Sequence, residues 1–203
     1  QLVQHRGGGC EGRCRMVEAG VEGRQRAVEN LLGSVAELRK SGQMVAAARA
    51  LNRVGRFQMR MSLAKDAAIT FQEALKLIEQ QPDIKTQIDS LNGLASTYGV
   101  NKCELVEPAV NQALTFSKQN NYVAGEAEAL RILSYCQNLR DHVLALKTAQ
   151  ESLVLWSSID RKRGIADAYV AIGEFQMAQH NLEECAQSLQ AALNIFRDLS
   201  DEV

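Results

Sequence analysis

One short pattern recurs along this chain and constrains its fold more than any other feature. In the two clearest copies, Gly55 and Gly173 are each followed, at identical gaps, by a small residue, a large apolar residue and an Ala-Leu pair. These later members are Ala67, Phe71 and Ala74-Leu75 in one copy, and Cys185, Leu189 and Ala192-Leu193 in the other. Unrelated amphipathic helices rarely share such gaps, so the chain is predicted to be a repeat protein.

The spacing within each copy predicts a helical hairpin. We expect Gly55 where two antiparallel helices approach most closely, with the small Ala67 meeting it from the second helix. Phe71 and Ala74-Leu75 continue that second helix at i, i+3 and i+4, which gives it an apolar stripe. Because one hairpin cannot bury both of its faces, neighbouring hairpins must stack.

These residues resemble the tetratricopeptide repeat family. The matching sets are Val54-Gly55 with Ala67, Phe71 and Ala74-Leu75; Leu94-Ala95 with Tyr98 and Ala113-Leu114; Leu133-Ser134 with Ala145, Ala149 and Leu153; and Ile172-Gly173 with Cys185, Leu189 and Ala192-Leu193. The resemblance covers roughly residues 43–203 and implies an all-α fold, a right-handed α-solenoid of antiparallel helical hairpins. Gly125 and Gly164 open similar segments 39 residues apart, against about 34 in the standard repeat. This resembles the long-period subclass, of about 39 to 40 residues, found in peptide-sensing and signalling scaffolds.

The domain organisation follows from the same pattern. Residues 1–20 are rich in glycine, which costs a helix about 1 kcal/mol at each position, so we expect a flexible segment there. An N-terminal helix is predicted over residues 21–40, where Val28, Leu31, Leu32, Val35 and Leu38 share one side. The four repeats are predicted at about 43–81, 84–120, 123–160 and 163–200.

Composition excludes several other classes of protein. With 46% hydrophobic and 23% charged residues, the chain is typical of a folded, water-soluble protein. No apolar stretch approaches the roughly 18 residues needed to span a bilayer, and the N-terminus lacks the apolar core of a signal peptide. We therefore expect a cytoplasmic protein without membrane contact, although a chain that opens on Gln leaves a removed leader open.

The five cysteines are odd in number and scattered along the sequence. We expect reduced thiols that fill helical cores, as Cys185 does at the small position of its repeat. Cys10 and Cys14 would share a helix face, but a closed zinc site needs further ligands that the neighbouring sequence lacks. The sequence therefore predicts no metal site, and no cofactor is expected.

Charge is distributed unevenly along the chain. Residues 1–60 carry a net charge of +6 and residues 61–203 a net charge of −7. Such a polar molecule would steer and orient a charged ligand. Nucleic acid is not the expected partner, because the total charge is mildly acidic and few exposed aromatic residues are predicted.

The family resemblance implies where a partner would bind. In tetratricopeptide folds the first helix of each hairpin lines a concave groove, and its solvent-facing positions meet the ligand. Carried onto this sequence, those positions are Arg49, Asn52, Arg53, Arg56 and Arg60; Asp89, Asn92 and Ser96; Glu128, Arg131 and Tyr135; and Asp167 and Glu174. The groove would run from basic to acidic.

Guanidinium groups hold carboxylates in a bidentate manner. One hypothesis is therefore that Arg49, Asn52, Arg53 and Arg56 bind the acidic end or C-terminal carboxylate of a peptide. The alternative is that these arginines coat a helix face or pair with acidic residues of the preceding helix, such as Glu29 and Glu37. The sequence leaves both open.

Neither a catalytic centre nor a single function follows from the remaining residues. No pattern supplies a nucleophile with its base, so an enzyme is not expected, and Trp156 is predicted to lie in the core. The sequence favours a protein or peptide interaction scaffold that is part of a larger protein. Two alternatives remain: a ligand-sensing module of a signalling protein, and a self-assembly domain or homodimer formed through the C-terminal helix. The apolar edge for self-assembly comprises Leu193, Ile195, Phe196 and Leu199.

Overall fold

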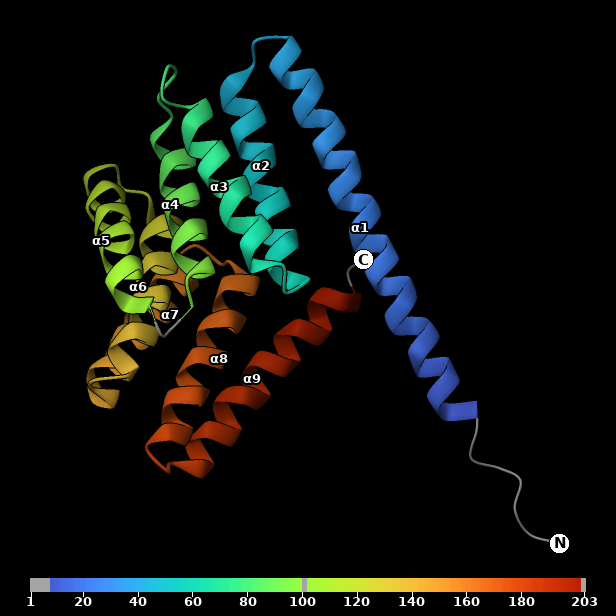
Figure 1. Cartoon of the computed structure of the whole chain (residues 1–203). Coiled ribbons are helices and arrows are strands. Elements are labelled where there is room, and N and C mark those ends of the chain that lie inside the picture. The colour runs from blue at the N-terminus through green and yellow to red at the C-terminus, as the bar shows by residue number, and fades with distance from the viewer. Residues whose placement is uncertain (1–7, 100–101, 202–203) are drawn as a thin grey trace, which may run out of the picture.

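The computed structural model describes residues 8–99 and 102–201, and nine helices account for most of them (Figure 1). Their bounds are α1 Gly8–Lys40, α2 Met44–Arg60, α3 Ala64–Leu77, α4 Ile84–Thr97, α5 Cys103–Gln119, α6 Val123–Asn138, α7 His142–Ser158, α8 Lys162–Ala178 and α9 Leu182–Asp201. The predicted all-α solenoid is confirmed. The pairs α2–α3, α4–α5, α6–α7 and α8–α9 lie in the ranges where the four repeats were predicted.

Short polar segments set the helix boundaries. Asp83 begins α4 and accepts a hydrogen bond from the Thr86 backbone N–H, and Asp141 caps α7 in the same way. Several turns place a polar residue or glycine at positive φ, a common way to end a helix. These positions are Gly42, Ser62, Gly99, Asn121, Asp160 and His180. The chain can therefore reverse direction within a few residues and stack its helices as hairpins.

Phe71 is the central packing residue of the first two repeats. Its side chain is fully buried between α2 and α4, and a Cβ added at either Gly55 or Gly93 would overlap its ring. Ala67, which was expected to meet Gly55, is buried in the same cluster as Phe71. The atoms nearest to the position of such a Cβ at Gly55 all belong to the Phe71 ring, so this ring fills the space that the glycine leaves free.

The N-terminal helix is longer than the sequence analysis predicted. It begins at Gly8 rather than at residue 21, so a non-helical segment over residues 8–20 is wrong, and residues 1–7 lie outside the described residues. Alanine, glutamate and arginine between the glycines favour helix, and the penalty at each glycine is only about 1 kcal/mol. Near its C-terminal end, Val35 and Leu38 pack against Ala47 and Leu51 of α2.

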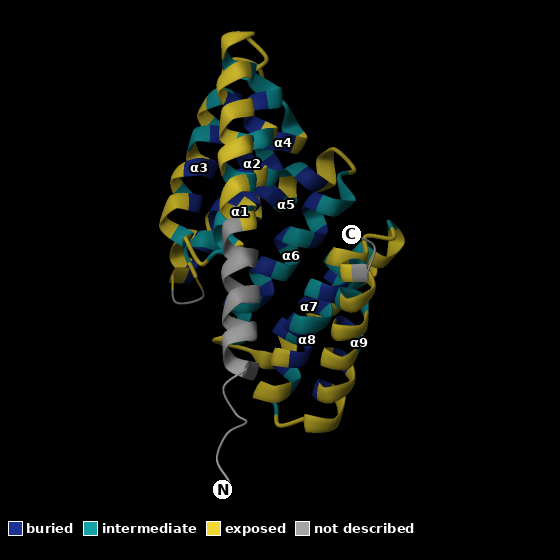
Figure 2. Cartoon of the chain, turned by 90° about the vertical axis from the view of Figure 1, so that its right-hand side faces the viewer, coloured by how far each residue is buried: buried dark blue, intermediate teal, exposed yellow. Residues whose placement is uncertain are grey.

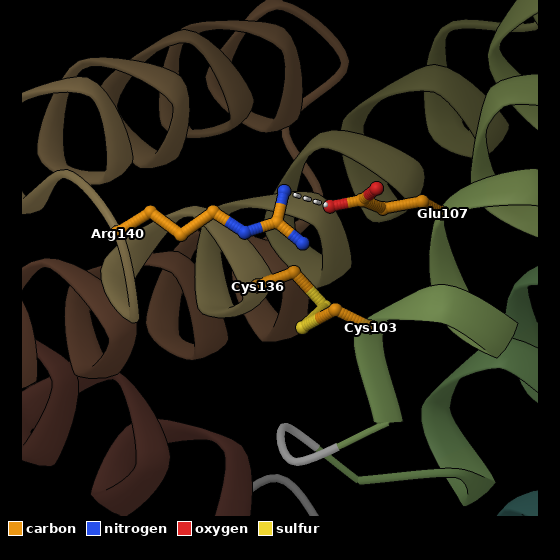
Figure 3. Close-up of a disulfide and its surroundings, with 4 residues drawn as sticks. All are labelled: Cys103, Glu107, Cys136 and Arg140. Atoms are coloured by element: carbon orange, nitrogen blue, oxygen red, sulfur yellow. Dashed lines mark hydrogen bonds and ion pairs between the residues drawn. A yellow bond between two sulfur atoms is a disulfide. The ribbon is translucent and has the colours of Figure 1, made fainter.

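A disulfide joins the second and third repeats, and it corrects the prediction of reduced thiols. Cys103 at the start of α5 and Cys136 near the end of α6 are bonded, with Cα atoms 5.5 Å apart (Figure 3). Both side chains are buried. Beside them, Arg140 donates a hydrogen bond of 2.9 Å to Glu107. Cys103 opens α5 and Cys136 lies near the end of the antiparallel α6, so the two cysteines meet across this pair of helices at a sequence separation of 33. Cys185 remains a free, buried thiol.

Candidate functional site

The first helices of the four repeats surround a cavity of about 540 Å³. Its walls come from α2, α4, α6 and α8, with single contributions from α3 and α7. The curvature of the stack (Figure 1) brings Arg161 and Arg163, at the beginning of α8, into the lining of the same hollow as Arg60, at the end of α2. The first helices of the four repeats therefore line one concave hollow, as the family resemblance implied.

The structure brings most of the predicted site residues to this cavity. Its lining includes Arg56, Arg60, Asn92, Ser96, Arg131, Tyr135 and Asp167, together with Asp89 and Glu128. Four predicted residues do not line it, namely Arg49, Asn52, Arg53 and Glu174. Of these, Arg53 and Glu174 are exposed. The cavity mixes both charges along its length, which differs from the predicted change from basic to acidic.

Arg49 and Asn52 instead connect the first two repeats. Arg49 forms an ion pair of 3.0 Å with Asp83. Asn52 is buried, donates to the Thr86 carbonyl oxygen at 3.2 Å and accepts from the Ser90 hydroxyl at 2.9 Å. These partners belong to the following repeat, so Arg49 pairs with Asp83 and not with the acidic residues of the preceding helix that one alternative had named, such as Glu29 and Glu37.

Each carboxylate in the lining has an arginine partner. Arg56 donates to Asp89 at 3.1 Å, Arg163 to Asp167 at 3.3 Å, and Arg131 to both oxygens of Glu128 at 2.6 and 3.0 Å. Within each pair the two charges therefore neutralise each other. The Arg56–Asp89 pair joins two repeats, whereas the other two pairs lie within α6 and within α8.

Burial and pairing shift the pKa values of these groups in opposite directions. Burial raises the pKa of Asp89 and Asp167, and their arginine partners only partly offset it. For Glu128, burial also opposes ionisation, but the Arg131 guanidinium outweighs it and lowers the pKa. Burial, with the nearby Glu174 carboxylate, raises the pKa of Tyr135 to about 12. All three carboxylates face arginines, but only Glu128 gains net stabilisation of its charged form.

Two arginines in the lining form no ion pair within 4.0 Å among the described residues, although the Asp167 carboxylate acts on Arg60 from a greater distance. Arg60 ends α2, and Arg161 precedes α8. Partial burial lowers the pKa of Arg60, and the facing Arg163 guanidinium lowers it further. Arg161 lies close enough to Tyr122 to lower the pKa of that phenol, which burial and Asp89 raise. The cavity thus contains excess positive charge contributed by opposite ends of the repeat stack.

Among the lining residues that carry a polar group, sequence reasoning missed Tyr122, Trp156, Arg161 and Arg163. Trp156 was predicted to be core, but it is only partly buried and forms part of the cavity wall against Gly164. Its Nε1 atom and the Oδ1 atom of Asn92 are buried and have no hydrogen-bond partner within the described chain. Both atoms belong to cavity-lining residues, so the wall contains unused hydrogen-bonding capacity.

The described residues form neither a metal site nor a membrane-spanning helix. His, Cys, Asp and Glu side chains do not gather there in groups of three or more that could hold a metal ion. Within the same residues, every helix is too short or too polar to cross a bilayer.

Comparison with known proteins identifies the fold. No family model matches the chain, and no curated protein matches its sequence. The crystal structure of BtubC (BKLC) from P. vanneervenii is similar, with a TM-score of 0.64 and 17% identity over 86% of this chain and 74% of that chain. Two crystal structures of MamA give TM-scores of 0.47 and 0.46 at 17% and 16% identity; they cover 82% and 87% of this chain and 96% of each MamA chain. At this identity the likeness to BtubC establishes the fold alone. The chain folds as an all-α solenoid of antiparallel helical hairpins.

Proposed function

We propose that this chain is a protein-interaction module that binds a segment of a partner protein in its concave cavity, as a long-period tetratricopeptide scaffold without catalysis of its own. A cavity of about 540 Å³ surrounded by four helices offers a preformed surface. Binding to a preformed site costs less free energy, because less of the protein has to be ordered when the ligand binds.

The unpaired charge in the cavity supports a partner segment that carries an acidic side chain or a free carboxylate. Three arginines are already paired with Asp89, Glu128 and Asp167, whereas Arg60 and Arg161 are not. Guanidinium groups bind carboxylates through charge-assisted hydrogen bonds. This observation carries the proposal, and it moves the predicted anion site from Arg49 and Arg53 to the opposite end of α2.

The proposal can be tested by selecting binders from a phage-displayed library of random 12-residue peptides. We expect the native chain to enrich peptides with aspartate or glutamate, with binding that weakens as salt is added. The double substitution Arg60→Glu and Arg161→Glu should weaken these peptides by about tenfold or more. The matched pair Arg53→Glu and Arg197→Glu makes the same charge change on exposed residues outside the cavity and should leave binding unchanged. Enrichment without acidic residues, or equal losses in both variants, would overturn the proposal.

Self-association is a second candidate, and α9 carries the observation that favours it. Most of α9 is exposed (Figure 2), and Leu182, Leu189 and Leu193 on this helix have exposed fractions of 68%, 37% and 42%. Apolar residues in a row on one helix are typical of a covered surface. Sedimentation of the native chain should show a concentration-dependent dimer, and Leu189→Lys with Leu193→Lys should abolish it. A monomer at all concentrations would exclude this candidate.

The cytoplasmic location remains a prediction, and the disulfide bears on it. Disulfides persist mainly in oxidising compartments. Because both side chains are buried, labelling of Cys103 and Cys136 with a thiol reagent under denaturing conditions at the moment of cell lysis, followed by mass spectrometry, would distinguish the two situations. Protection from the reagent would support an oxidising location, and full labelling a reducing one.

A further inference from the structure

A second hollow of about 270 Å³ adjoins the charged cavity. Met59, Ser96, Arg131 and Tyr135 line both hollows, so the two are continuous along one wall. The remaining lining of the second hollow comes from α4, α5, α6 and the residue after α4, and consists of Ala95, Gly99, Val106, Ile132 and Cys136. Most of these residues are apolar, in contrast to the charged cavity beside it.

The polar side chains around this hollow already have partners. The Ser96 hydroxyl donates to the Gly93 carbonyl oxygen at 2.6 Å. The Arg131 guanidinium is held by Glu128, and Cys136 is in the disulfide. A ligand entering here would therefore meet side chains whose hydrogen-bonding needs are met.

Tyr135 also lines the hollow, and its polar group likewise has a partner already. Its hydroxyl interacts with Glu174, and its ring stands edge-on to Phe175 with centroids 5.2 Å apart. The hydroxyl thus interacts with a residue outside the hollow, and the contact with Phe175 helps to fix the position of the ring. What remains for a ligand is aromatic, thioether and aliphatic surface from Tyr135, Met59, Val106 and Ile132.

We propose that this hollow binds one large apolar side chain, of the size of phenylalanine, leucine or methionine, from the same partner segment whose anionic group lies between Arg60 and Arg161. A cavity of about 150 Å³ is enough for a benzene molecule, so 270 Å³ admits such a side chain. Its transfer from water is favoured by roughly 1.5 to 3 kcal/mol. This inference rests on the proposed function, because it concerns a subsite of the same groove.

The hollow can be probed without the partner, using N-acetylphenylalaninamide and N-acetylleucinamide. Methyl resonances of the methionines report binding, because Met59 lines the hollow whereas Met44, Met61 and Met177 do not. We expect a saturable shift at Met59 alone and none with N-acetylasparaginamide. Met59→Gln, which places a polar amide in the wall, should weaken both apolar probes at least threefold, and the control Met61→Gln should not. Unsaturable shifts, or equal shifts at Met59 and Met177, would overturn the inference.

Two results separate this inference from the proposed function. Arg60→Glu with Arg161→Glu should leave binding of N-acetylphenylalaninamide unchanged, because neither arginine lines the second hollow. In the selected peptides, replacing the apolar residue by alanine should weaken binding to the native chain but have little effect on the Met59→Gln variant. If acidic peptides bind without any preference for apolar residues, the hollow is not a subsite, but the proposed function of the charged cavity is still supported. If the apolar probes bind at Met59 but acidic peptides do not bind the chain, the proposed anion site at Arg60 and Arg161 is wrong, and the apolar hollow is supported.

Discussion

The first and last repeats place a large apolar residue at the same position, but the structure buries only one of them. Phe71 of α3 is fully buried between Gly55 and Gly93. Leu189 of α9 packs against Gly173 of its own hairpin and is 37% exposed. The hairpin supplies one side of the contact and the following repeat supplies the other. Full burial at this position therefore depends on the next repeat, since 37% of Leu189 stays exposed where its own hairpin alone covers it, as expected for a solenoid.

The helices that line the cavity also differ between the two halves of the stack. In the N-terminal half, buried amides tie one repeat to the next, through Asn52 to the Thr86 carbonyl and through Asn92 to the Gly125 carbonyl. Arg131 and Val170 occupy the equivalent positions in α6 and α8. Arg131 uses its guanidinium within its own helix. The N-terminal half is thus joined by buried hydrogen bonds, whereas the C-terminal half depends more on local ion pairs.

Truncating the two equivalent apolar residues should give the largest contrast. Phe71→Ala leaves a cavity lined by two glycines, and we expect it to lower the free energy of unfolding by about 3 to 5 kcal/mol. Leu189→Ala should cost less than about 1.5 kcal/mol, because part of that side chain already meets water. Urea unfolding followed by circular dichroism measures both values. Similar losses would show that the last repeat is covered by a partner copy.

Breaking the disulfide tests the boundary between the two halves. Cys103 and Cys136 close a loop with a sequence separation of 33, and a cross-link of this span stabilises a fold by about 3 to 4 kcal/mol. A phosphine reductant should therefore lower the melting temperature of the native chain. The reductant should have no such effect on the Cys103→Ser, Cys136→Ser double variant, which already melts lower. An unchanged melting temperature in the native chain would contradict a stabilising role.

Removing a buried amide should have an intermediate effect confined to the N-terminal half. Asn52→Ala leaves the Ser90 hydroxyl and the Thr86 carbonyl without that partner, and we expect a cost of about 1 to 3 kcal/mol. The amide does not titrate, so the cost should be the same at pH 4 and pH 7. Val170→Ala, at the equivalent position of α8, removes no such hydrogen bond and should cost less. Thermal melts of both variants at the two pH values provide the comparison.

Neutralising the ion pair in the C-terminal half should have the smallest effect, and it should depend on pH. The pKa of Glu128 is lowered in the fold, so its stabilisation is present above its ordinary value of 4.5 and is lost as the pH falls through the lower folded value. Glu128→Gln should therefore cost about 1 to 2 kcal/mol at pH 7 and progressively less below pH 4.5. Asp89 and Asp167 have raised pKa values and act in the opposite sense, since their protonation in acid favours the fold. A cost that does not vary with pH would contradict this assignment.

Local spacing in the sequence was enough to predict the helical hairpins. A glycine and an aromatic residue 16 positions later define how two helices of a hairpin meet, and Gly55 and Phe71 do so in the structure. The disulfide was not predicted, because each cysteine was considered only within its own helix. The available signal was that the start of one helix and the end of the next antiparallel helix lie side by side, as Cys103 and Cys136 do. The helix over residues 8–20 was missed because glycine propensity was weighed without the helix formers between the glycines.

The candidate site was predictable only in part, because it depends on the curvature of the stack. Positions along one helix face gave Arg56, Asn92 and Arg131 correctly as cavity residues. Arg161 precedes α8 and comes into the cavity only because the solenoid bends far enough to bring it towards α2. No local spacing encodes that bend. Asn52 is the opposite case. It lies on the helix face predicted to meet a ligand, but its side chain forms a hydrogen bond with the next repeat instead.

The placement of Arg60 and Arg161 has a consequence for how the molecule unfolds. In the described chain, α2 and α8 share no packed interface, so the first and fourth repeats can open independently, as in a one-dimensional array. An anion bound by both arginines would connect the first and fourth repeats directly, and not only through the second and third repeats. Opening of either end would then release the ligand, so hydrogen exchange in α2 and α8 should slow together on binding. A partner would thereby convert a chain of locally cooperative units into a single cooperative one.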